Sequence, residues 1–374
     1  MKVPKLELVD LRKEYAGGDV VAVDGINLSV DPGETLALLG PSGCGKSTAL
    51  NMIVGLEQPT GGDIRVDGAS VVAMPAGQRN IGLVFQDYAV FTSMTVRQNL
   101  AFGLKIRNMD RNSVNREVEK TAELLGMKDR LEAKASTLGG SELQRVAIGR
   151  TLVTKPSLLL LDEPLSNLEA PARLAMRQEL RRLQQEIALT VVYVTHDQVE
   201  ALSLADHIAV MSYGKIIQVE KTARIVEAPG HAGVAAFLGS PPMNILRGRI
   251  NVENGRVRFT GYNLTFLLPA CSIPDCCAAA QAGVMLSLGF RAEDLSLAGA
   301  GDGLAAGRVL DIEARGMDSI VSVDVRGTIM KSIVLSTSSV HEGETVGLTV
   351  APDDIHIFDG WTGLRINERF HGNG

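Results

Sequence analysis

The sequence is poor in the features that place a chain inside a membrane. None of its apolar runs reaches the ~18 residues that span a bilayer, and the strongest of them, Leu158 to Leu161, ends at a carboxylate. The first residues, MKVPKLELVDLRKEY, alternate charged and apolar side chains, whereas a signal peptide contains one continuous apolar stretch. We therefore expect a protein that crosses no membrane and stays in the cytoplasm.

Cysteine is also scarce, and three of the four cysteines crowd into the segment CSIPDCC. The four are Cys44, Cys271, Cys276 and Cys277. A zinc site needs a second CxxC pair or a pair of histidines, and the sequence completes neither set. We expect reduced thiols with a structural role. The net charge of -6 and the lack of any block of Lys and Arg argue against a nucleic-acid partner.

A length of 374 residues exceeds one ordinary core and predicts two domains. In the first, residues 4–238, short apolar strands alternate with helical stretches, which is typical of an α/β domain with a parallel sheet covered by helices. Strands are predicted at residues 35–39, 80–85, 158–161 and 191–195, helices at 141–154 and 174–187, and a hairpin at Tyr213-Gly214.

The character of the chain changes at Gly239-Ser240-Pro241-Pro242, because two prolines neither continue a helix nor sit in a central strand. We place the domain boundary between residues 238 and 239. Beyond it come the alternating segments GRVRFTG, VMLSLGF, SIVSVDV and ETVGLTV, separated by turn residues. Residues 239–374 are therefore predicted to form a small all-β barrel or sandwich.

The strongest local motif is GPSGCGKST, which follows the apolar segment TLALL and precedes the helical stretch STALNMIV. It fits a phosphate-binding loop in the required strand–loop–helix context. Its backbone N–H groups and the helix N-terminus favour phosphate, Lys46 adds a point charge, and Ser47 can bind Mg²⁺. The predicted nucleotide contacts are Gly40, Pro41, Ser42, Gly43, Cys44, Gly45, Lys46, Ser47 and Thr48.

A nucleotide site also needs a carboxylate for the metal and a base for the attacking water. Asp162 and Glu163 end the apolar strand LLLL and supply both. Asp162 is predicted to hold Mg²⁺ through water, and Glu163 to act as the general base. An acidic helix cap is the alternative explanation for this pair.

With both motifs present, residues 4–238 resemble the nucleotide-binding domain of ABC transporters, a P-loop fold with a helical subdomain. The resemblance implies that Gln86, in VFQDYAVF, bridges the metal site and the membrane partner. It implies that His196, at the end of VVYVTH, contacts the γ-phosphate. It also implies that Tyr15 stacks on the adenine of ATP.

The signature that separates this family from other phosphate-loop enzymes, LSGGQ, is altered. The matching stretch is Leu138-Gly139-Gly140-Ser141-Glu142, so Gly139 replaces the serine and Ser141 the second glycine. Gly139, Gly140 and Ser141 are the expected contacts to the γ-phosphate bound by the other subunit. Glu169 stands where the family usually has aspartate. These departures bear on the hydrolysis rate and not on the fold.

The segments GSPPMN, GFRAEDL and VAPDDIHIFD resemble the linker and TOBE-type barrel of the carbohydrate-import ATPases. That resemblance implies a homodimer, or a heterodimer with a close relative, which clamps two ATP molecules and binds Mg²⁺. It also implies two membrane-spanning permease subunits, an extracytoplasmic solute-binding protein, and a place at the cytoplasmic face of the membrane. Sugar is the leading solute, while glycerol phosphate, polyamines and metal ions stay open.

Two other functions are compatible with a nucleotide-binding domain of this kind: a soluble ABC ATPase of DNA repair or translation, and a weakly hydrolysing binding switch. A soluble ABC ATPase of DNA repair would carry a long coiled coil between Lys46 and Asp162, and no sustained heptads lie there. A translation factor would normally fuse two such domains, whereas this chain has one phosphate loop. The altered signature keeps open a weakly hydrolysing ATPase that acts as a binding switch.

Overall fold

The computed structural model describes residues 3–253, 256–261, 264–267, 285–301, 303–336 and 338–366. Cys271, Cys276 and Cys277, predicted as reduced thiols, lie outside the described residues. The chain divides into two compact units, Met1–Ala223 and Arg224–Gly374, which we call the N-terminal unit and the C-terminal unit. Each is described by itself.

The N-terminal unit is built on a six-stranded sheet with the order β10-β9-β3-β8-β7-β6. Its strands are β3 (Thr35–Leu39), β6 (Ile81–Val84), β7 (Leu158–Asp162), β8 (Val191–Thr195), β9 (His207–Ser212) and β10 (Lys215–Lys221). All neighbours pair in parallel except β10, which pairs antiparallel with β9 at the edge. Every residue of β3 and β8 is buried, as expected of parallel strands covered on both faces. The predicted strands and the hairpin at Tyr213-Gly214 are confirmed.

A second, antiparallel sheet with the order β2-β1-β4-β5 was not predicted. It consists of β1 (Leu6–Tyr15), β2 (Val20–Val30), β4 (Gly61–Val66) and β5 (Ala69–Ser70). Register shifts interrupt the pairing of β1 with β2 after Leu8 and again after Leu11. Leu6, Leu8 and Leu11 are all buried, so the alternation slips by one residue at the first shift and the two-residue period is lost.

The helices of the N-terminal unit begin at α1 (Lys46–Val54) and end at α6 (Gln198–Leu204). Between them come α2 (Val96–Ile106), α3 (Arg111–Leu124), α4 (Gly140–Leu152) and α5 (Ala170–Ile187). Short 3₁₀ turns lie at Ala16–Gly18, Ala76–Gln78, Lys128–Arg130, Ala135–Thr137 and, in the C-terminal unit, Pro352–Asp354. Among the described helices, none combines the length and the apolar character that a membrane crossing requires.

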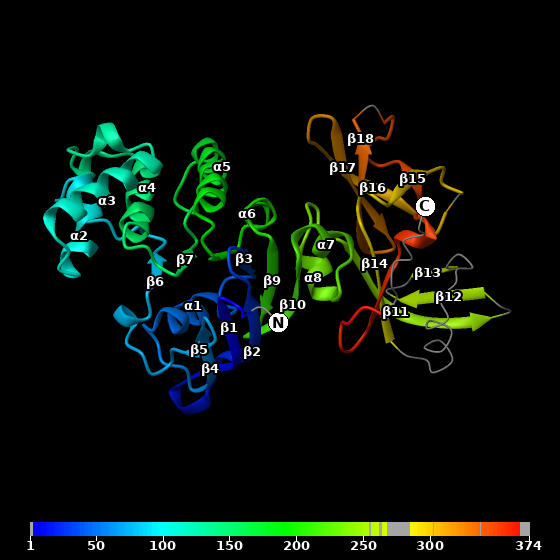
Figure 1. Ribbon diagram of the computed structural model, residues 1–374. Helices are drawn as coiled ribbons and strands as arrows, with labels where there is room; N and C mark the ends of the chain where they lie inside the picture. The colour runs from blue at the N-terminus through cyan, green and yellow to red at the C-terminus, as the bar shows by residue number, and fades with distance from the viewer. Residues whose placement is uncertain are drawn as a thin grey trace. The chain divides into compact units, whose positions relative to one another are not determined.

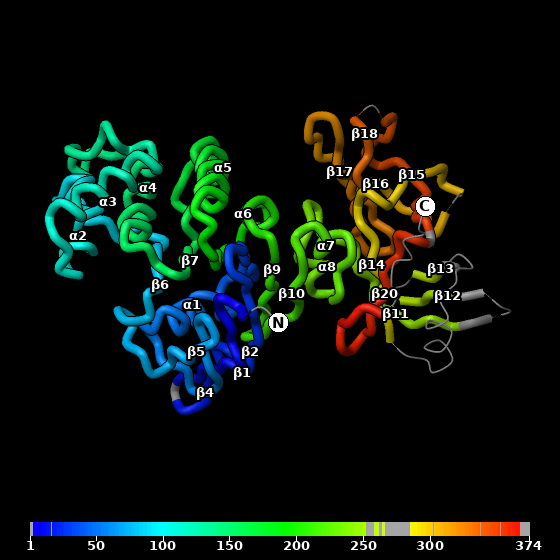
Figure 2. The backbone as a smooth tube through the Cα atoms, in the orientation of Figure 1, coloured from blue at the N-terminus to red at the C-terminus, as the bar shows by residue number. Residues whose placement is uncertain are grey.

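Helices α2, α3 and α4 gather at one end of the N-terminal unit, beyond β6 and β7, and form the helical subdomain (Figure 1). The tube in Figure 2 shows that the chain runs through β1 to β6 before it enters these helices and then returns to the six-stranded sheet at β7. Local capping fixes two of the helix starts: Thr95 forms a capping box with Gln98 at α2, and Asp110 caps α3. This insertion separates Gln86 from Asp162 in sequence while β6 and β7 pair directly.

After residue 238, the regular secondary structure of the described residues is β-strand apart from one 3₁₀ turn, as predicted. One sheet has the order β13-β12-β11-β14-β20 and the other β15-β19-β16-β17-β18. The strands of the first are β11 (Asn244–Glu253), β12 (Arg256–Gly261), β13 (Leu264–Leu267), β14 (Met285–Phe290) and β20 (His356–Asp359). Those of the second are β15 (Ser296–Ala298), β16 (Ala305–Ala314), β17 (Asp318–Val325), β18 (Thr328–Leu335) and β19 (Thr345–Thr349). One apolar cluster draws residues from both sheets, among them Phe259 and Val323.

The compact units divide between Ala223 and Arg224, whereas the sequence places the domain boundary after residue 238. Helix α7 (Thr222–Glu227) spans the division, and α8 (Ala232–Phe237) follows it. Helix α8 packs on β11 and β14. The guanidinium of Arg291 donates to the carbonyl oxygens of Val226 and Leu238. These contacts join residues 224–238 to the β-sheet strands and to Arg291 in the C-terminal unit.

Candidate functional site

The motif at residues 40–48 consists of the loop between β3 and α1, residues 40–45, and the first three residues of α1, and the loop lies close against neighbouring backbone segments. A Cβ on Gly40 would lie 2.2 Å from the carbonyl oxygen of Met211. A Cβ on Gly45 would lie 2.2 Å from the carbonyl oxygen of Ala22, and the φ of Gly45 is 106°. Only glycine fits at either position. The sequence therefore fixes a tight turn whose backbone leads straight into the N-terminus of α1.

Lys46 is the first residue of α1 and is only 5% exposed. Its ammonium donates hydrogen bonds to the carbonyl oxygens of Gly40 (2.8 Å) and Pro41 (2.9 Å). The charge is thus held by the loop itself, at a helix end that already favours anions. Four of the other predicted contacts lie in the loop itself, namely Pro41, Ser42, Gly43 and Cys44, whereas Thr48 lies in the first turn of α1. Gly214 N–H donates to the Cys44 carbonyl at 3.1 Å.

Ser47 and Asp162 come together although 115 positions separate them in sequence. The Ser47 Oγ lies 3.4 Å from Asp162 Oδ1. Burial raises the pKa of Asp162, and the nearby charge of Glu163 raises it further, while the Ser47 hydroxyl and the Lys46 charge oppose the shift. The Ser47 hydroxyl and the Lys46 charge do not fully offset burial and the charge of Glu163. A cation bound beside Asp162 would stabilise its ionised form.

Glu163 follows β7 in a left-handed conformation, with a φ of 43°. Such a backbone disfavours a residue with a side chain by ~1–2 kcal/mol. Its N–H donates to the Val194 carbonyl at 2.9 Å, and the Ser166 hydroxyl donates to the Glu163 carbonyl at 2.8 Å. Held in this way, the carboxylate Oε1 lies 3.0 Å from Nδ1 of His196. The structure thus brings the predicted base and the predicted switch histidine into contact.

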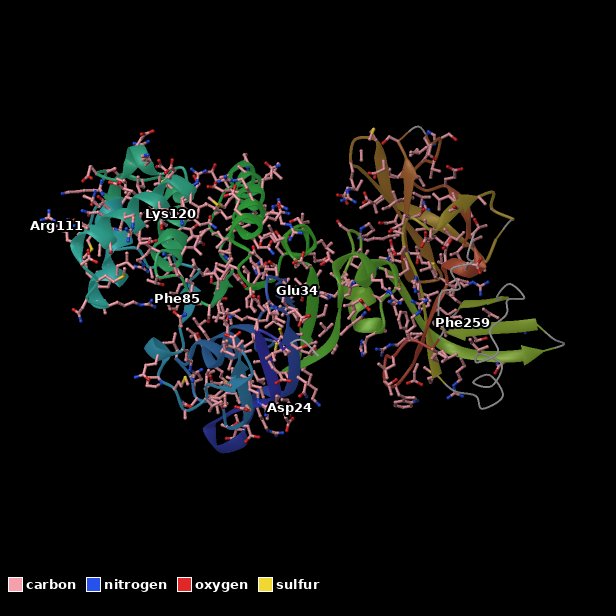
Figure 3. All side chains as sticks on the ribbon, viewed as in Figure 1. Asp24, Glu34, Phe85, Arg111, Lys120 and Phe259 are labelled. Atoms are coloured by element: carbon pink, nitrogen blue, oxygen red, sulfur yellow. The ribbon has the colours of Figure 1, made fainter. Side chains whose placement is uncertain are left out.

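Glu163 and His196 open onto a cleft that also contains Gln86. The cleft is lined by Gln86, Glu163, Ser166, Asn167, Arg173, Thr195, His196, Asp197 and Glu200. Gln86 lies just beyond β6, and its carbonyl accepts a hydrogen bond from Asn167 Nδ2 at 2.8 Å. The preceding residue, Phe85, lies between the helical subdomain, which carries Arg111 and Lys120, and the strands that carry Asp24 (Figure 3).

Tyr15 ends β1 and is 39% exposed. The ammonium of Lys13 lies over its ring, 4.9 Å from the ring centroid. The same ammonium pairs with Glu57 Oε1 at 2.5 Å and donates to the Gln58 carbonyl at 2.7 Å. One face of the ring is therefore covered by a fixed cation, which is itself electrostatically favourable.

The signature residues lie at the start of α4. Gly139 precedes the helix, and its N–H donates to Glu142 Oε2 at 3.1 Å. Arg130 Nε lies 3.1 Å from the other carboxylate oxygen of Glu142. A Cβ on Gly140 would contact Leu168, in the segment after Glu163. Within the described part of the chain, no hydrogen bond joins Gly139, Gly140 or Ser141 to the phosphate loop.

Several residues of the site were not singled out from the sequence. Arg173 of α5 donates to the Leu168 carbonyl at 3.0 Å, and its guanidinium lies 3.7 Å from the Asp197 carboxylate. Glu200 is buried and accepts hydrogen bonds from two hydroxyl groups. The capping role of Glu142 was readable from its spacing of three after Gly139. Lys13, Arg173 and Glu200 act through partners that only the folded chain identifies.

Comparisons with known proteins identify the family to which the chain belongs. A family model described as "ABC transporter" matches residues 23–166, and one described as "TOBE domain" matches residues 288–358. The trehalose/maltose import ATP-binding protein of Thermococcus litoralis is 40% identical over 96% of this chain and 99% of its own length. The chain belongs to the ATP-binding subunits of ABC importers. It binds ATP, and it hydrolyses ATP to drive import.

Other members of the family are similarly close. An sn-glycerol-3-phosphate import ATP-binding protein of Agrobacterium fabrum is 41% identical over 95% of this chain and 98% of its own length. A xylose/arabinose import ATP-binding protein of Haloferax volcanii is 38% identical over 98% and 97%. Among solved structures, cbiO1 of Clostridium perfringens, part of the ABC transporter complex cbiONQ, matches with a TM-score of 0.56 at 28% identity, over 60% of this chain and 91% of that one. This importer ATPase therefore combines the ABC fold with a C-terminal TOBE domain.

Proposed function

We propose that this importer ATPase serves the uptake of a sugar or of a closely related small hydroxylated solute such as glycerol phosphate. Support comes from the relatives named above, whose solutes are disaccharides, pentoses and a phosphorylated polyol. Selection of the solute belongs to a separate solute-binding protein and to two membrane-spanning permease subunits. The ATPase is bound to the cytoplasmic face of the membrane through these permeases.

The nucleotide is held by the loop at residues 40–48. Its backbone and the N-terminus of α1 receive the phosphates, and Lys46 exchanges its two carbonyl contacts for phosphate oxygens. Tyr15 stacks on the adenine with the ring face opposite Lys13, because the ammonium occupies the other face.

The donor set around Asp162 fits Mg²⁺. The ion is small and hard, and takes one or two protein oxygens, phosphate oxygens and water. Ser47 Oγ and Asp162 Oδ1, 3.4 Å apart, would hold it together with Gln86. Bound there, Mg²⁺ would offset negative charge on the β- and γ-phosphates. Burial and the charge of Glu163 raise the pKa of Asp162, and a cation bound there would offset both effects by stabilising the carboxylate.

Glu163 is the general base of hydrolysis. Its carboxylate accepts a proton from the attacking water while His196, 3.0 Å away, orients it and reaches toward the γ-phosphate. Gln86, in the same cleft, senses the permease through the segment that follows it. Two ATPase subunits, identical or closely related, clamp ATP between one phosphate loop and the start of α4 in the partner.

The contact between Glu163 and His196 supports the roles proposed for these residues in ATP hydrolysis. The variant Glu163→Gln tests the role of Glu163 as general base. The amide keeps the shape but accepts no proton, so ATP hydrolysis should fall by a factor of ~10²–10⁴ while ATP still binds. Size-exclusion chromatography with Mg²⁺ and ATP should then show a stable dimer. The matched control is Glu186→Gln on the exposed face of α5, which pairs with Arg182 and should leave turnover unchanged. Wild-type turnover in Glu163→Gln would refute the assignment.

A weakly hydrolysing binding switch is the second candidate, and Glu142 favours it. Its carboxylate accepts a hydrogen bond from the Gly139 N–H at the start of α4, where a γ-phosphate bound by the partner subunit is expected. The two functions separate in proteoliposomes that contain the permease subunits and the solute-binding protein. Uptake of labelled maltose or glycerol 3-phosphate that requires steady ATP hydrolysis supports the importer. A nucleotide-dependent dimer without uptake or steady hydrolysis supports the switch.

A further inference from the structure

A buried carboxyl group lies directly behind the predicted switch histidine, and the proposed hydrolysis makes no use of it. Glu200 is on α6 and is only 3% exposed. Its Oε2 accepts a hydrogen bond from the Tyr193 hydroxyl at 2.8 Å and another from the Thr195 hydroxyl at 2.9 Å. Burying a carboxyl group costs free energy, and hydrogen bonds such as these two offset part of that cost.

The Thr195 hydroxyl makes a second hydrogen bond on the other side of His196. While it donates to Glu200, its Oγ1 accepts from the backbone N–H of Asp197 at 2.9 Å. Thr195 and Asp197 are the two chain neighbours of His196. The hydroxyl therefore bridges the backbone turn from which the imidazole projects.

Strand pairing and helix capping also fix the two residues on either side of His196. Thr195 is the last residue of β8 and pairs with Leu39 of β3. The Asp197 carboxylate caps α6 by accepting from the N–H groups of Val199 (2.8 Å) and Glu200 (3.2 Å). Glu200 therefore lies in the helix that Asp197 caps, and it also accepts the hydrogen bond from the Thr195 hydroxyl.

The Glu200 carboxyl group also fixes the orientation of the Thr195 hydroxyl. We call the chain of hydrogen bonds from Glu200 through this hydroxyl to the Asp197 N–H the relay. Burial raises the pKa of Glu200, and its Oε2 is the acceptor for both hydroxyl groups. The Thr195 O–H must then point at Glu200, which leaves an oxygen lone pair for the Asp197 N–H. A hydroxyl free to rotate would satisfy the Asp197 N–H only part of the time. The His196 side chain is 53% exposed, so its own packing does little to fix it.

We propose that Glu200, acting through the Thr195 hydroxyl, is a positioning residue that holds His196 at the distance and angle needed to orient Glu163. This inference rests on the proposed roles of His196 and Glu163 in hydrolysis. Glu200 lines the same cleft as Glu163 and His196, and the effect proposed for it passes through the Thr195 hydroxyl to the Asp197 N–H.

Thr195→Val in the full-length protein tests the relay, because valine keeps the β-branched shape and removes the hydroxyl. Turnover at saturating ATP should fall about tenfold, the effect of losing one hydrogen bond that matters in the rate-limiting step. KM for ATP should stay within about twofold, since the phosphate loop is untouched. Thr195→Ser keeps the hydroxyl and should restore most of the turnover. Thr195→Ala removes the same hydroxyl with less bulk and gives a second route to the same readout.

Tyr193→Phe is the matched control. It removes the other hydrogen bond to Glu200, from the same strand and at similar burial, but leaves the Thr195–Asp197 bond in place. It should lower the melting temperature about as much as Thr195→Val and change kcat by less than about threefold. If the two variants lose kcat equally, in proportion to their loss of stability, the network is only structural and the inference is wrong.

A double-mutant cycle with His196→Ala shows whether the effect passes through the imidazole. In the His196→Ala protein, Thr195→Val should reduce kcat by less than about twofold further. A full additional tenfold loss would mean that the hydroxyl acts by another route and would overturn the inference. If His196→Ala alone leaves wild-type turnover, the proposed function of the dyad fails as well. If His196→Ala abolishes turnover and Thr195→Val does nothing, only the relay fails.

Discussion

The carboxylate of Asp162 illustrates how a single residue of the site weakens the resting fold. Burial and the neighbouring Glu163 raise its pKa above that of a free aspartate. The folded chain therefore binds a proton at Asp162 more tightly than the unfolded chain does. The stability that this group contributes is present below the ordinary pKa of ~3.9 and is lost as the pH rises through the raised folded value.

We therefore expect Asp162→Asn to melt at a higher temperature than the wild type at pH 7.5 without nucleotide, by a few degrees, and to show no gain near pH 4. Thermal melts at the two pH values check this. The variant should also lose the additional stability that Mg²⁺ with ATP gives the wild type. An equal gain at both pH values would show that packing, and not charge, is responsible.

Asp110→Asn provides a control of the opposite sign. Hydrogen bonds from Ser113, through its side chain and its backbone N–H, lower the pKa of Asp110 at the start of α3. Its ionised form therefore supports folding above its usual pKa, and the stability falls as the pH drops through the lowered value. Replacing Asp110 should give no gain in stability at pH 7.5.

Gly139 is the second residue whose identity bears on the rate. Its φ of -75° and ψ of 166° are open to any residue, and a Cβ there would meet only Glu142 Oε2 at 4.0 Å. Serine therefore fits without strain. We expect Gly139→Ser to raise steady-state ATP hydrolysis by up to about tenfold, because a hydrogen bond to a charged phosphate is worth ~1.5–3 kcal/mol and part of it is already supplied by the helix N-terminus.

Ser141→Ala is the companion variant for this test. If the Ser141 hydroxyl already reaches the phosphate, removing it lowers turnover and Gly139→Ser adds little. If Gly139→Ser raises turnover and Ser141→Ala leaves it unchanged, the lost hydroxyl belongs at position 139. A change of less than about twofold in both variants, ~0.4 kcal/mol, would mean that no hydroxyl of this segment matters to the limiting step.

At the scale of elements, the end of α1 depends on one buried guanidinium. Arg79 is 3% exposed and donates to the carbonyl oxygens of Met52 (2.7 Å), Ile53 (2.9 Å), Met74 (2.9 Å) and Val72 (3.1 Å). Burial lowers the pKa of Arg79. A cation at a helix C-terminus is favourable, and these carbonyls would otherwise lack partners.

We expect Arg79→Met to destabilise the protein by about 3 kcal/mol or more, because each buried carbonyl left without a donor costs ~1–3 kcal/mol. Denaturant unfolding measures this. Arg65→Met is the control: its side chain is 42% exposed and pairs with Asp63 and Glu7 on the surface, so this substitution should lower the stability far less than Arg79→Met. Equal losses would show that the capping contacts add nothing.

Elements that end in a motif were predictable, and elements shaped by irregular pairing were not. The strands before Gly40, Gln86, Asp162 and His196 are short, apolar and buried in a parallel sheet, so their sequences form continuous apolar runs. The antiparallel sheet containing β1 escaped because its register shifts destroy the two-residue period. In the C-terminal unit, four alternating segments were named from the sequence, and they fall on β12, β14, β17 and β19. The other described strands and the division into two sheets were not predicted.

The same distinction applies to the candidate site. The phosphate loop and the pair Asp162-Glu163 are local patterns, and the structure brings Ser47 to Asp162 and Glu163 to His196. Arg173 and Lys13 look like ordinary surface charges in sequence. Their partners lie on segments that only the fold brings close, so no local pattern identifies them.

At the scale of the whole molecule, every predicted site residue lies in the N-terminal unit, between Tyr15 and His196. The segment at residues 224–238 lies between the last of them and the β-sheets, and the sequence alone assigns it to the ATPase. A proline pair marks the end of a helix clearly but does not show which domain that helix packs on. Long-range contacts bear on this, among them those made by Arg291 and by α8, and the boundary after residue 238 stays a prediction.

These contacts predict how the chain can be divided. A fragment of residues 239–374 loses two acceptors of Arg291, the carbonyls of Val226 and Leu238, and exposes Met243 and Phe358, which pack on Ala235. We therefore expect the fragment 224–374 to melt cooperatively and several degrees above the fragment 239–374, since ~1 kcal/mol shifts the melting temperature of a small domain by ~4–8 °C. Circular dichroism melts at equal concentration measure the difference. Identical melting of the two fragments, together with a loss of stability when 1–238 is shortened to 1–223, would instead assign residues 224–238 to the ATPase and place the boundary after residue 238.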